Sequence, residues 1–309
     1  MTYRSFLLAA AASMTLAVSA QAKGCNDVVF SDVGWTDITA TTAVTTKLLE
    51  ILGYKTEKRV LSVPVTYSAL ASGDVDVFLG NWMPTMQADI APYIKAGTVD
   101  TVRTNLTGAK YTLATNAAGA ALGIKDFADI AKHAKELRHQ IYGIEPGNDG
   151  NRLIEDMIDA NAFNLADFDV VESSEQGMLA QVGRAVDREK PIVFLGWAPH
   201  PMNTNYDLTY LSGGDDWFGP DFGGAEVRTN TTAGYVDACP NVGKLLENLE
   251  FSLEAENELM GAILDDGQDP DKAAQAWLKA HIAAVSPWLE GVTTRDGQNA
   301  YAAFQAAMK

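Results

Sequence analysis

The sequence lacks the common motifs of hydrolase, metal and nucleotide sites. Its 309 residues contain no G-x-S-x-G, H-E-x-x-H, P-loop or EF-hand loop. The four histidines stand at no metal-ligand spacing, and two distant cysteines make no zinc site. We therefore expect no catalytic residues, no metal and no cofactor, although so acid-rich a chain leaves a catalytic carboxylate pair open.

Positive charge is also scarce. Lys and Arg number 23 against 40 Asp and Glu, and the formal net charge is −17. Such a charge repels nucleic acid and anionic lipid, so we expect no nucleic-acid partner and favour a neutral or cationic ligand. With 47% hydrophobic residues the chain is still able to bury a sizeable core, in one large domain or two ordinary ones.

Long apolar runs are missing as well. Phe6–Val18 is apolar but too short to span a hydrocarbon core of about 30 Å. Arg4 precedes it, and Ala20-Gln21-Ala22 has the small-x-small pattern of a cleavage site. We interpret residues 1–22 as a secretory signal peptide, with a short membrane anchor as the alternative, and expect a periplasmic protein.

Cysteine is limited to Cys25 and Cys239, both beyond the predicted cleavage site. Two lone cysteines in an oxidising compartment usually pair, so we expect a disulfide, with two buried free thiols as the alternative. The bridge would tie the start of the mature chain to a distant segment. The chain would then leave a domain and return to it.

Short β and α patterns alternate along the chain, with polar turns between them. Strands are expected at 28–30, 59–63, 75–79, 110–115, 139–144, 168–171, 191–195, 208–211 and 225–229. Helices are expected at 41–52, 67–72, 152–162, 175–187, 242–251, 255–264 and 271–284. This alternation is typical of an α/β fold with mainly parallel sheets.

The patterns form two β/α units and a C-terminal third, which the predicted cysteine bridge assigns to the first unit. The second unit is then inserted into the first. We expect lobe I at 23–109 and 207–309 and lobe II at 110–206, with crossings near 108–111 and 203–207. A hinged chain of this kind binds its ligand between the lobes.

Two similar stretches, VFLGNWMPTM at 77–86 and VFLGWAPHPM at 193–202, place a tryptophan after an apolar run. Trp82 and Trp197 thus follow two expected strands, and Trp35 follows the first strand. Open α/β sheets bind ligands at the C-terminal ends of their strands. Three rings there predict a cage for an organic cation, with sugar stacking or a structural role for each ring as alternatives.

The other tryptophans are interpreted differently. Trp277 and Trp288 lie in the last helical stretch and are expected in the core. Trp217, in the loop GGDDWFGPDFGG, receives no assignment.

Three more residues are candidates for the same site. Tyr111 lies where the chain first crosses between lobes, and packing in the hinge strand is its alternative role. Asp37 either caps the following helix or presents a carboxylate to a cation or to a ligand hydroxyl. Asn148, in EPGNDGNRL, is either a turn or cap residue or a polar contact to the ligand.

These features together resemble the substrate-binding proteins of ABC importers for quaternary amines, the glycine betaine/choline-binding family. The resemblance is carried by the signal peptide, GWTD, FLGNW, the hinge tyrosine, EPG with its Asn, FLGWAPHPM and DACP, and it covers residues 23–309. It implies a type II periplasmic-binding-protein fold. Each lobe would be a mostly parallel sheet flanked by helices, and the lobes would close around one choline in the cleft.

The resemblance also implies roles for single residues. The trimethylammonium group would sit in an aromatic box of Trp35, Trp82, Tyr111 and Trp197. Asp37 and Asn148 would hold the hydroxyl end of the ligand. The disulfide of the family would map to Cys25 and Cys239.

Asp37 bears on which quaternary amine is bound. Glycine betaine carries a carboxylate that an ionised Asp37 would repel, whereas choline has a net positive charge and a hydroxyl donor. We therefore expect choline as ligand and weaker binding of acetylcholine, which lacks the donor and is bulkier. Glycine betaine or another quaternary amine is the alternative ligand.

The expected function is a non-enzymatic solute receptor. The expected partner is the membrane permease of an ABC importer, and the protein is expected to be a monomer. The alternative is a secreted choline-ester or phosphocholine hydrolase, which would need a nucleophile or a metal in the cleft that no motif supplies.

Overall fold

The computed structural model of the chain describes residues 24–309, so the predicted signal peptide at 1–22 lies outside the described residues. The described strands form one mixed sheet in the order β2-β1-β3-β9-β4-β7-β5-β6, and β8 pairs with β4. They are β1 (Asp27–Asp32), β2 (Lys55–Val60), β3 (Val77–Met83), β4 (Val99–Asn116), β5 (Gln140–Tyr142), β6 (Asp169–Val171), β7 (Val193–Ala198), β8 (Leu208–Tyr210) and β9 (Gly224–Thr232).

Helices surround this sheet. The first half of the described chain contains α1 (Thr36–Ile51), α2 (Val63–Ser72), α3 (Gln87–Ala96), α4 (Ala117–Leu122), α5 (Phe127–Ile130) and α6 (Asp149–Asp159). The second half contains α7 (Glu175–Asp187), α8 (Met202–Asn205), α9 (Asp215–Phe218), α10 (Pro220–Gly223), α11 (Tyr235–Ala238), α12 (Pro240–Asn248), α13 (Leu253–Leu264), α14 (Pro270–Ala280), α15 (Ile282–Val285) and α16 (Ala300–Ala307). Within residues 24–309, three short 3₁₀ turns lie at Ala131–His133, Ala162–Asn164 and Pro287–Leu289.

The two ends of the sheet are parallel and its middle is antiparallel. β1 pairs in parallel with β2 and β3, and β5 pairs in parallel with β6 and β7. Between these parallel parts, β4 and β9 pair antiparallel with each other and with their outer neighbours β7 and β3. The α/β class is as predicted, and two long antiparallel strands join its parallel parts.

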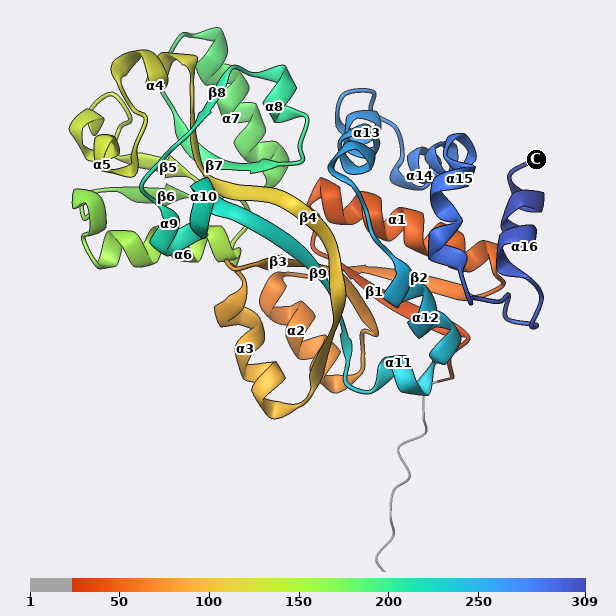
Figure 1. Cartoon of the computed structure of the whole chain (residues 1–309). Coiled ribbons are helices and arrows are strands. Elements are labelled where there is room, and N and C mark those ends of the chain that lie inside the picture. Colours follow the sequence, from red (N-terminus) through yellow and green to blue (C-terminus); the bar gives the residue numbers. More distant parts are fainter. Residues whose placement is uncertain (1–23) are drawn as a thin grey trace, which may run out of the picture.

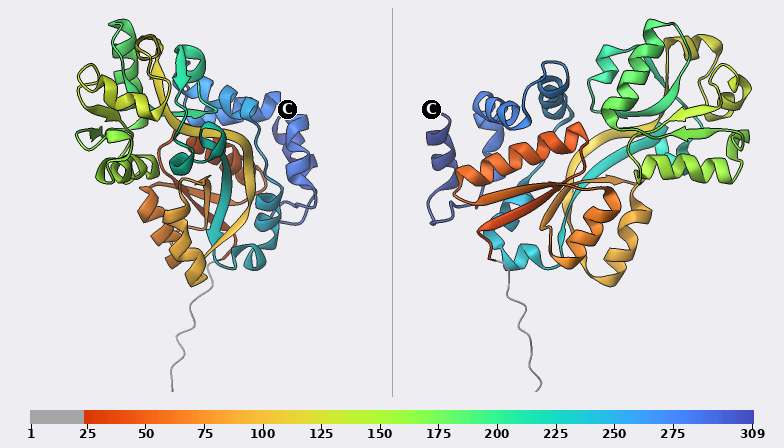
Figure 2. Two further views of the ribbon diagram at one scale, coloured as in Figure 1. Left: turned by 60° about the vertical axis from the view of Figure 1, so that its left-hand side comes forward. Right: turned by 180° about the vertical axis from the view of Figure 1, so that it is seen from behind.

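The elements gather into two groups on the two ends of these long strands. The first group holds β1–β3, α1–α3 and α11–α16, and the second group holds β5–β8 and α4–α10 (Figure 1). In the first group α1 lies on one face of the strands with α13 and α14 packed on it, and α2 and α3 lie on the other face (Figure 2). β4 and β9 run side by side from one group to the other (Figure 1).

Helix α1 begins at Thr36, five residues before the expected start at 41. Its first half is rich in threonine and lacks the one-sided apolar spacing of a surface helix, yet nearly all of it is buried. Thr41, Thr45 and Thr46 donate their hydroxyl groups to backbone carbonyls one turn earlier. Back-bonding of this kind satisfies buried hydroxyls, which explains why the sequence pattern did not reveal the start of the helix.

Strands β3 and β7 are longer than expected, and this changes the position of two tryptophans. Trp82 and Trp197 lie inside the last residues of β3 and β7, not beyond them. The expectation was wrong because the Gly before each Trp does not end the strand. In β3 the sheet accommodates it through an irregularity in the pairing between Phe78 and Asn81.

β8 lies with the second group, although its residues come after the expected end of lobe II at 206. β8 pairs with Ala114–Asn116 of β4, in the same part of the strand that pairs with β7. Helices α9 and α10 follow beside the second group (Figure 1). The described chain therefore returns to the first group along β9.

Two further expectations about the first group are confirmed. Cys25 and Cys239 form a disulfide that joins the segment before β1 to the start of α12. Trp277 and Trp288 are buried and stack on each other with ring centroids 6.0 Å apart. Within residues 24–309, no helix has the length and apolar character needed to cross a membrane.

Candidate functional site

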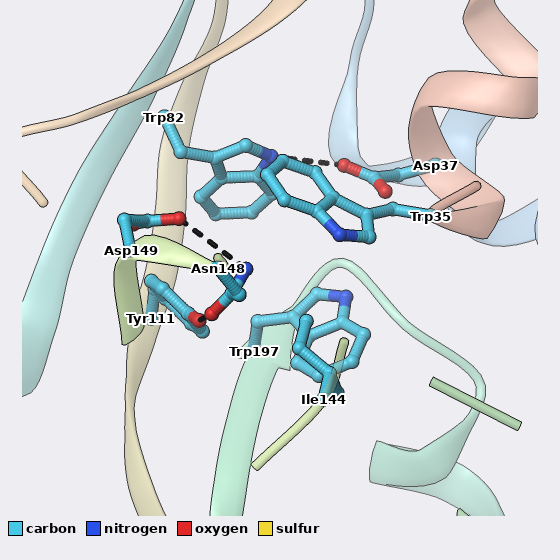
Figure 3. A pocket seen from close by; sticks show the side chains of 8 residues that line it. All are labelled: Trp35, Asp37, Trp82, Tyr111, Ile144, Asn148, Asp149 and Trp197. Atoms are coloured by element: carbon cyan, nitrogen blue, oxygen red, sulfur yellow. Dashed lines mark hydrogen bonds between the residues drawn. The ribbon is translucent and has the colours of Figure 1, made fainter. Parts of the chain in front are cut away.

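A pocket of about 280 Å³ lies where the two groups of elements meet (Figure 3). The pocket is lined by Trp35, Asp37, Trp82, Tyr111, Ile144, Asn148, Asp149 and Trp197. The structure thus brings together all six predicted ligand-binding residues and adds Ile144 and Asp149.

The pocket is assembled from the ends of separate elements. Trp35 precedes the first turn of α1, and Asp37 lies in that turn. Trp82 comes from the end of β3, and Tyr111 of β4 is paired in register with Trp197 of β7. Asn148 caps α6 in the second group. Both groups therefore supply walls, and the antiparallel register of β4 and β7 fixes two rings side by side.

The four aromatic side chains are buried and surround one space (Figure 3). Tyr111 contacts both neighbouring indoles, with ring centroids 5.9 Å from Trp82 and 6.3 Å from Trp197. Behind Tyr111, Phe218 packs edge to face at 5.8 Å. Such packing holds the rings in place, so that they offer a preformed aromatic wall. Trp217 next to Phe218 is not among the lining residues.

Asp37 is buried beside the indole of Trp82. Its Oδ2 accepts a hydrogen bond of 3.0 Å from Trp82 Nε1, so the carboxyl group orients that ring. Burial, with Glu175 nearby, raises the pKa of Asp37 from 3.8 to about 7. Asp37 is not the cap residue of α1, because the helix begins at Thr36 and Trp35 occupies that position.

Asn148 caps α6, as one of its two interpretations expected, and it also lines the pocket. Its Oδ1 accepts from the backbone N–H groups of Gly150 and Asn151 at 2.8 and 3.2 Å. The same oxygen accepts from the hydroxyl of Tyr111 at 2.9 Å. Only Nδ2 remains to serve a ligand, and it lies 3.3 Å from Asp149 Oδ1 as a donor.

Asp149 was not predicted as a site residue. Its side chain is buried, and its Oδ2 has no hydrogen-bond partner in the described structure. Burial raises the pKa of Asp149 from 3.8 to about 7. In the sequence, its position next to Asn148 at the start of a helix could have indicated a site residue. An Asp in a Gly-rich turn, however, is more often a turn residue.

Trp35 is held from across the pocket by a residue that was also missed. Its Nε1 donates a hydrogen bond of 2.8 Å to Glu145 Oε1, which follows β5 in the second group. Glu145 is the first residue of the EPG motif, whose Asn alone was singled out. The contact fixes the plane of the indole when the two groups are together.

The pocket combines aromatic faces with two buried carboxyl groups and contains no cationic side chain among its lining residues. Ring quadrupoles attract a desolvated cation, at about 0.5 to 2 kcal/mol per ring. In residues 24–309 no cluster of three His, Cys, Asp or Glu side chains is arranged to hold a metal ion. The arrangement suits a small organic cation.

Comparisons with known proteins agree with this geometry. A family model, the substrate-binding domain of ABC-type glycine betaine transport systems, matches residues 26–280. An ABC-transporter choline-binding protein in complex with choline is 67% identical, with a TM-score of 0.91, and the match covers 92% of this chain and 99% of that chain. An ABC-transporter choline-binding protein in an unliganded semi-closed conformation shows the same identity and coverage, with a TM-score of 0.85.

A more distant structure has the same fold. Lactococcal OpuAC in its closed-liganded conformation with glycine betaine is 26% identical, with a TM-score of 0.77, and the match covers 85% of this chain and 99% of that chain. These matches confirm the predicted two-lobe type II periplasmic-binding-protein fold. The arrangement of the present chain is more similar to the choline complex than to the semi-closed form.

Proposed function

This chain belongs to the family of substrate-binding domains of ABC-type glycine betaine transport systems, and on that premise we propose that it captures choline and delivers it to an ABC importer. The observation that carries the proposal is the buried pocket of four aromatic rings and two carboxyl groups. A trimethylammonium group has no N–H to donate, so ring faces are the groups able to select it.

We propose that Trp35, Trp82, Tyr111 and Trp197 surround the trimethylammonium group. The hydroxyl end then lies near the carboxyl group of Asp37 and near Asn148 Nδ2, which donates one hydrogen to Asp149 Oδ1 and has a second for the hydroxyl oxygen. Asp149 Oδ2 is a second acceptor for the hydroxyl proton, because it is buried without a partner in the described structure. Hydrogen bonds to the hydroxyl group orient choline within the aromatic cage.

The carboxyl groups favour choline over glycine betaine. A betaine carboxylate needs N–H or cationic donors, whereas the lining residues include no cationic side chain and place Asp37 and Asp149 beside the amide of Asn148. Above pH about 7, where both groups are ionised, they disfavour a ligand carboxylate by repulsion and by loss of solvation. Acetylcholine keeps the cation but lacks the hydroxyl donor and is bulkier, so it binds more weakly.

The two groups of elements act as lobes joined by β4 and β9. Lobe II remains inserted into lobe I. The second crossing moves from 203–207 to β9, because β8 pairs with the lobe II end of β4. The lobes close on choline, and the closed form docks on the membrane permease. The protein works as a periplasmic monomer without catalysis.

Calorimetric titration of the mature protein tests the proposal with choline, acetylcholine, glycine betaine and a neutral sugar. We expect choline to bind most tightly, acetylcholine more weakly, and the sugar not at all. Betaine binding as tight as choline would contradict the role of the carboxyl groups. Hydrolysis of a choline ester by the protein would favour the enzyme alternative.

A further inference from the structure

Glu175 lies behind the pocket and contacts the facing lobe. It is the first residue of α7 in lobe II, and its side chain is 1% exposed. Its Oε2 accepts from the backbone N–H of Thr36 at 2.7 Å, and its Oε1 accepts from the Thr36 hydroxyl at 2.7 Å. Thr36 is the first residue of α1 in lobe I. The carboxylate of Glu175 in lobe II therefore accepts hydrogen bonds at the N-terminus of α1 in lobe I.

His200 adds a third donor to the same carboxylate. His200 Nδ1 accepts from the backbone N–H of Met202 at 2.9 Å, so the ring proton is on Nε2. Nε2 donates to Glu175 Oε1 at 3.1 Å. Three hydrogen atoms thus point at the Glu175 side chain, and the N-termini of α1 and α7 add positive potential around it.

The cluster of Glu175, Thr36 and His200 is connected to one tryptophan of the aromatic box in each lobe. Thr36 directly follows Trp35, and His200 packs edge to face on Trp197 with centroids 4.9 Å apart. Glu175 itself does not line the pocket. Holding Thr36 and His200 on one carboxylate therefore fixes the distance between two box rings that come from opposite lobes.

We propose that Glu175 is a positioning residue that latches the closed lobes and sets how long the ligand stays bound. The inference rests on the proposed function, since a latch matters only if the lobes close on a ligand. In an open form, Glu175 and the N-terminus of α1 are each solvated. Closure exchanges those waters for buried, charge-assisted hydrogen bonds, which act on dissociation more than on encounter.

Other contacts between the lobes are more exposed and supply matched controls. Asn205 Nδ2 donates to Asp265 Oδ1 at 2.8 Å, and both residues are exposed. Exposed polar contacts of this kind contribute little, so Asn205→Ala is expected to change choline affinity less than about twofold.

The test measures choline association and dissociation by stopped-flow tryptophan fluorescence for wild type, Glu175→Gln and Asn205→Ala. In Glu175→Gln the amide nitrogen meets either the Thr36 N–H or the His200 Nε2–H, both donors. We expect dissociation about 10- to 100-fold faster, with association changed less than about threefold. Wild-type dissociation from folded Glu175→Gln would overturn the inference.

A second pair of variants covers the case in which Glu175→Gln fails to fold. Thr36→Ser keeps the hydroxyl donor and is expected to dissociate choline at the wild-type rate. Thr36→Val removes the donor and is expected to release choline about tenfold faster. Equal rates for the two variants would contradict the latch.

Failure of the latch and failure of choline binding are distinguishable. If wild type does not bind choline in the titration, the proposed function falls, and the latch is judged on the ligand-free protein alone. Spin labels at exposed Val60 and Leu122, one on each lobe, then report the interlobe distance. Glu175→Gln should shift that distribution toward longer distances, and an unchanged distribution would contradict the latch.

Discussion

At the scale of single residues, the two buried carboxyl groups of the pocket respond to both protons and cations. Burial raises the pKa of Asp37 and of Asp149 to about 7. Because both values are raised above those of the unfolded chain, their contribution to stability is present at low pH. It is lost as pH rises through about 7.

A bound cation favours the ionised carboxyl groups, so choline binding and proton release are linked. We expect choline affinity to rise with pH, and to be about tenfold weaker at pH near 5.5 than at pH near 8. Titration in two buffers of different ionisation enthalpy measures the protons released. Asp37→Asn should make the profile shallower, because only Asp149 then remains to release a proton, and a flat profile in wild type would contradict the linkage.

At the scale of elements, the start of α6 holds the tyrosine of the box in place. A Cβ added at Gly150 would lie 2.0 Å from Tyr111 Oη and 2.7 Å from its Cζ. The ring has little room to yield, because Phe218 and Trp82 pack against it. The glycine is therefore part of how the helix positions the pocket.

Gly150→Ala is accordingly expected to weaken choline binding by about tenfold or more, since Tyr111 must leave its hydrogen bond to Asn148. Gly261→Ala in α13 is the matched control, because the nearest atom to its added Cβ is 3.9 Å away. That control should keep wild-type affinity and gain roughly 0.5–1 kcal/mol of stability. Calorimetry and thermal unfolding check both variants, and wild-type choline affinity in Gly150→Ala would be evidence against this role.

At the scale of the whole molecule, the disulfide and the binding site lie at opposite ends of β1. Cys25 precedes the strand and is joined to Cys239, 214 residues away in sequence. Trp35 follows the other end of the strand, where the pocket lies. The bridge therefore joins the segment before β1 to the start of α12 without lining the pocket.

The double variant Cys25→Ser and Cys239→Ser tests this separation. We expect the free energy of unfolding to fall by about 2–5 kcal/mol, because a long loop is released in the unfolded chain. Choline affinity below the unfolding temperature should stay within about twofold of wild type. A large loss of affinity with an unchanged fold would show that the bridge also shapes the pocket.

The sequence by itself determined the class of fold, the disulfide and the six residues gathered in the pocket. Those features have local signals: alternating β and α patterns, a lone pair of cysteines, and tryptophans placed near strand ends. The signals fix which residues stand near the C-terminal edge of a strand. They do not fix where an element starts, as α1 and β7 illustrate.

Only the tertiary structure decided the contacts between the lobes. The sequences around four residues are ordinary for turns and helix starts: Glu145, Asp149, Glu175 and His200. No local sequence pattern distinguishes these side chains from solvated surface groups. Glu145 contacts a partner 110 residues away in sequence, and Glu175 contacts one 139 residues away. Burial and hydrogen bonding between such distant residues depend on how the chain crosses the cleft along β4 and β9, which no local pattern encodes.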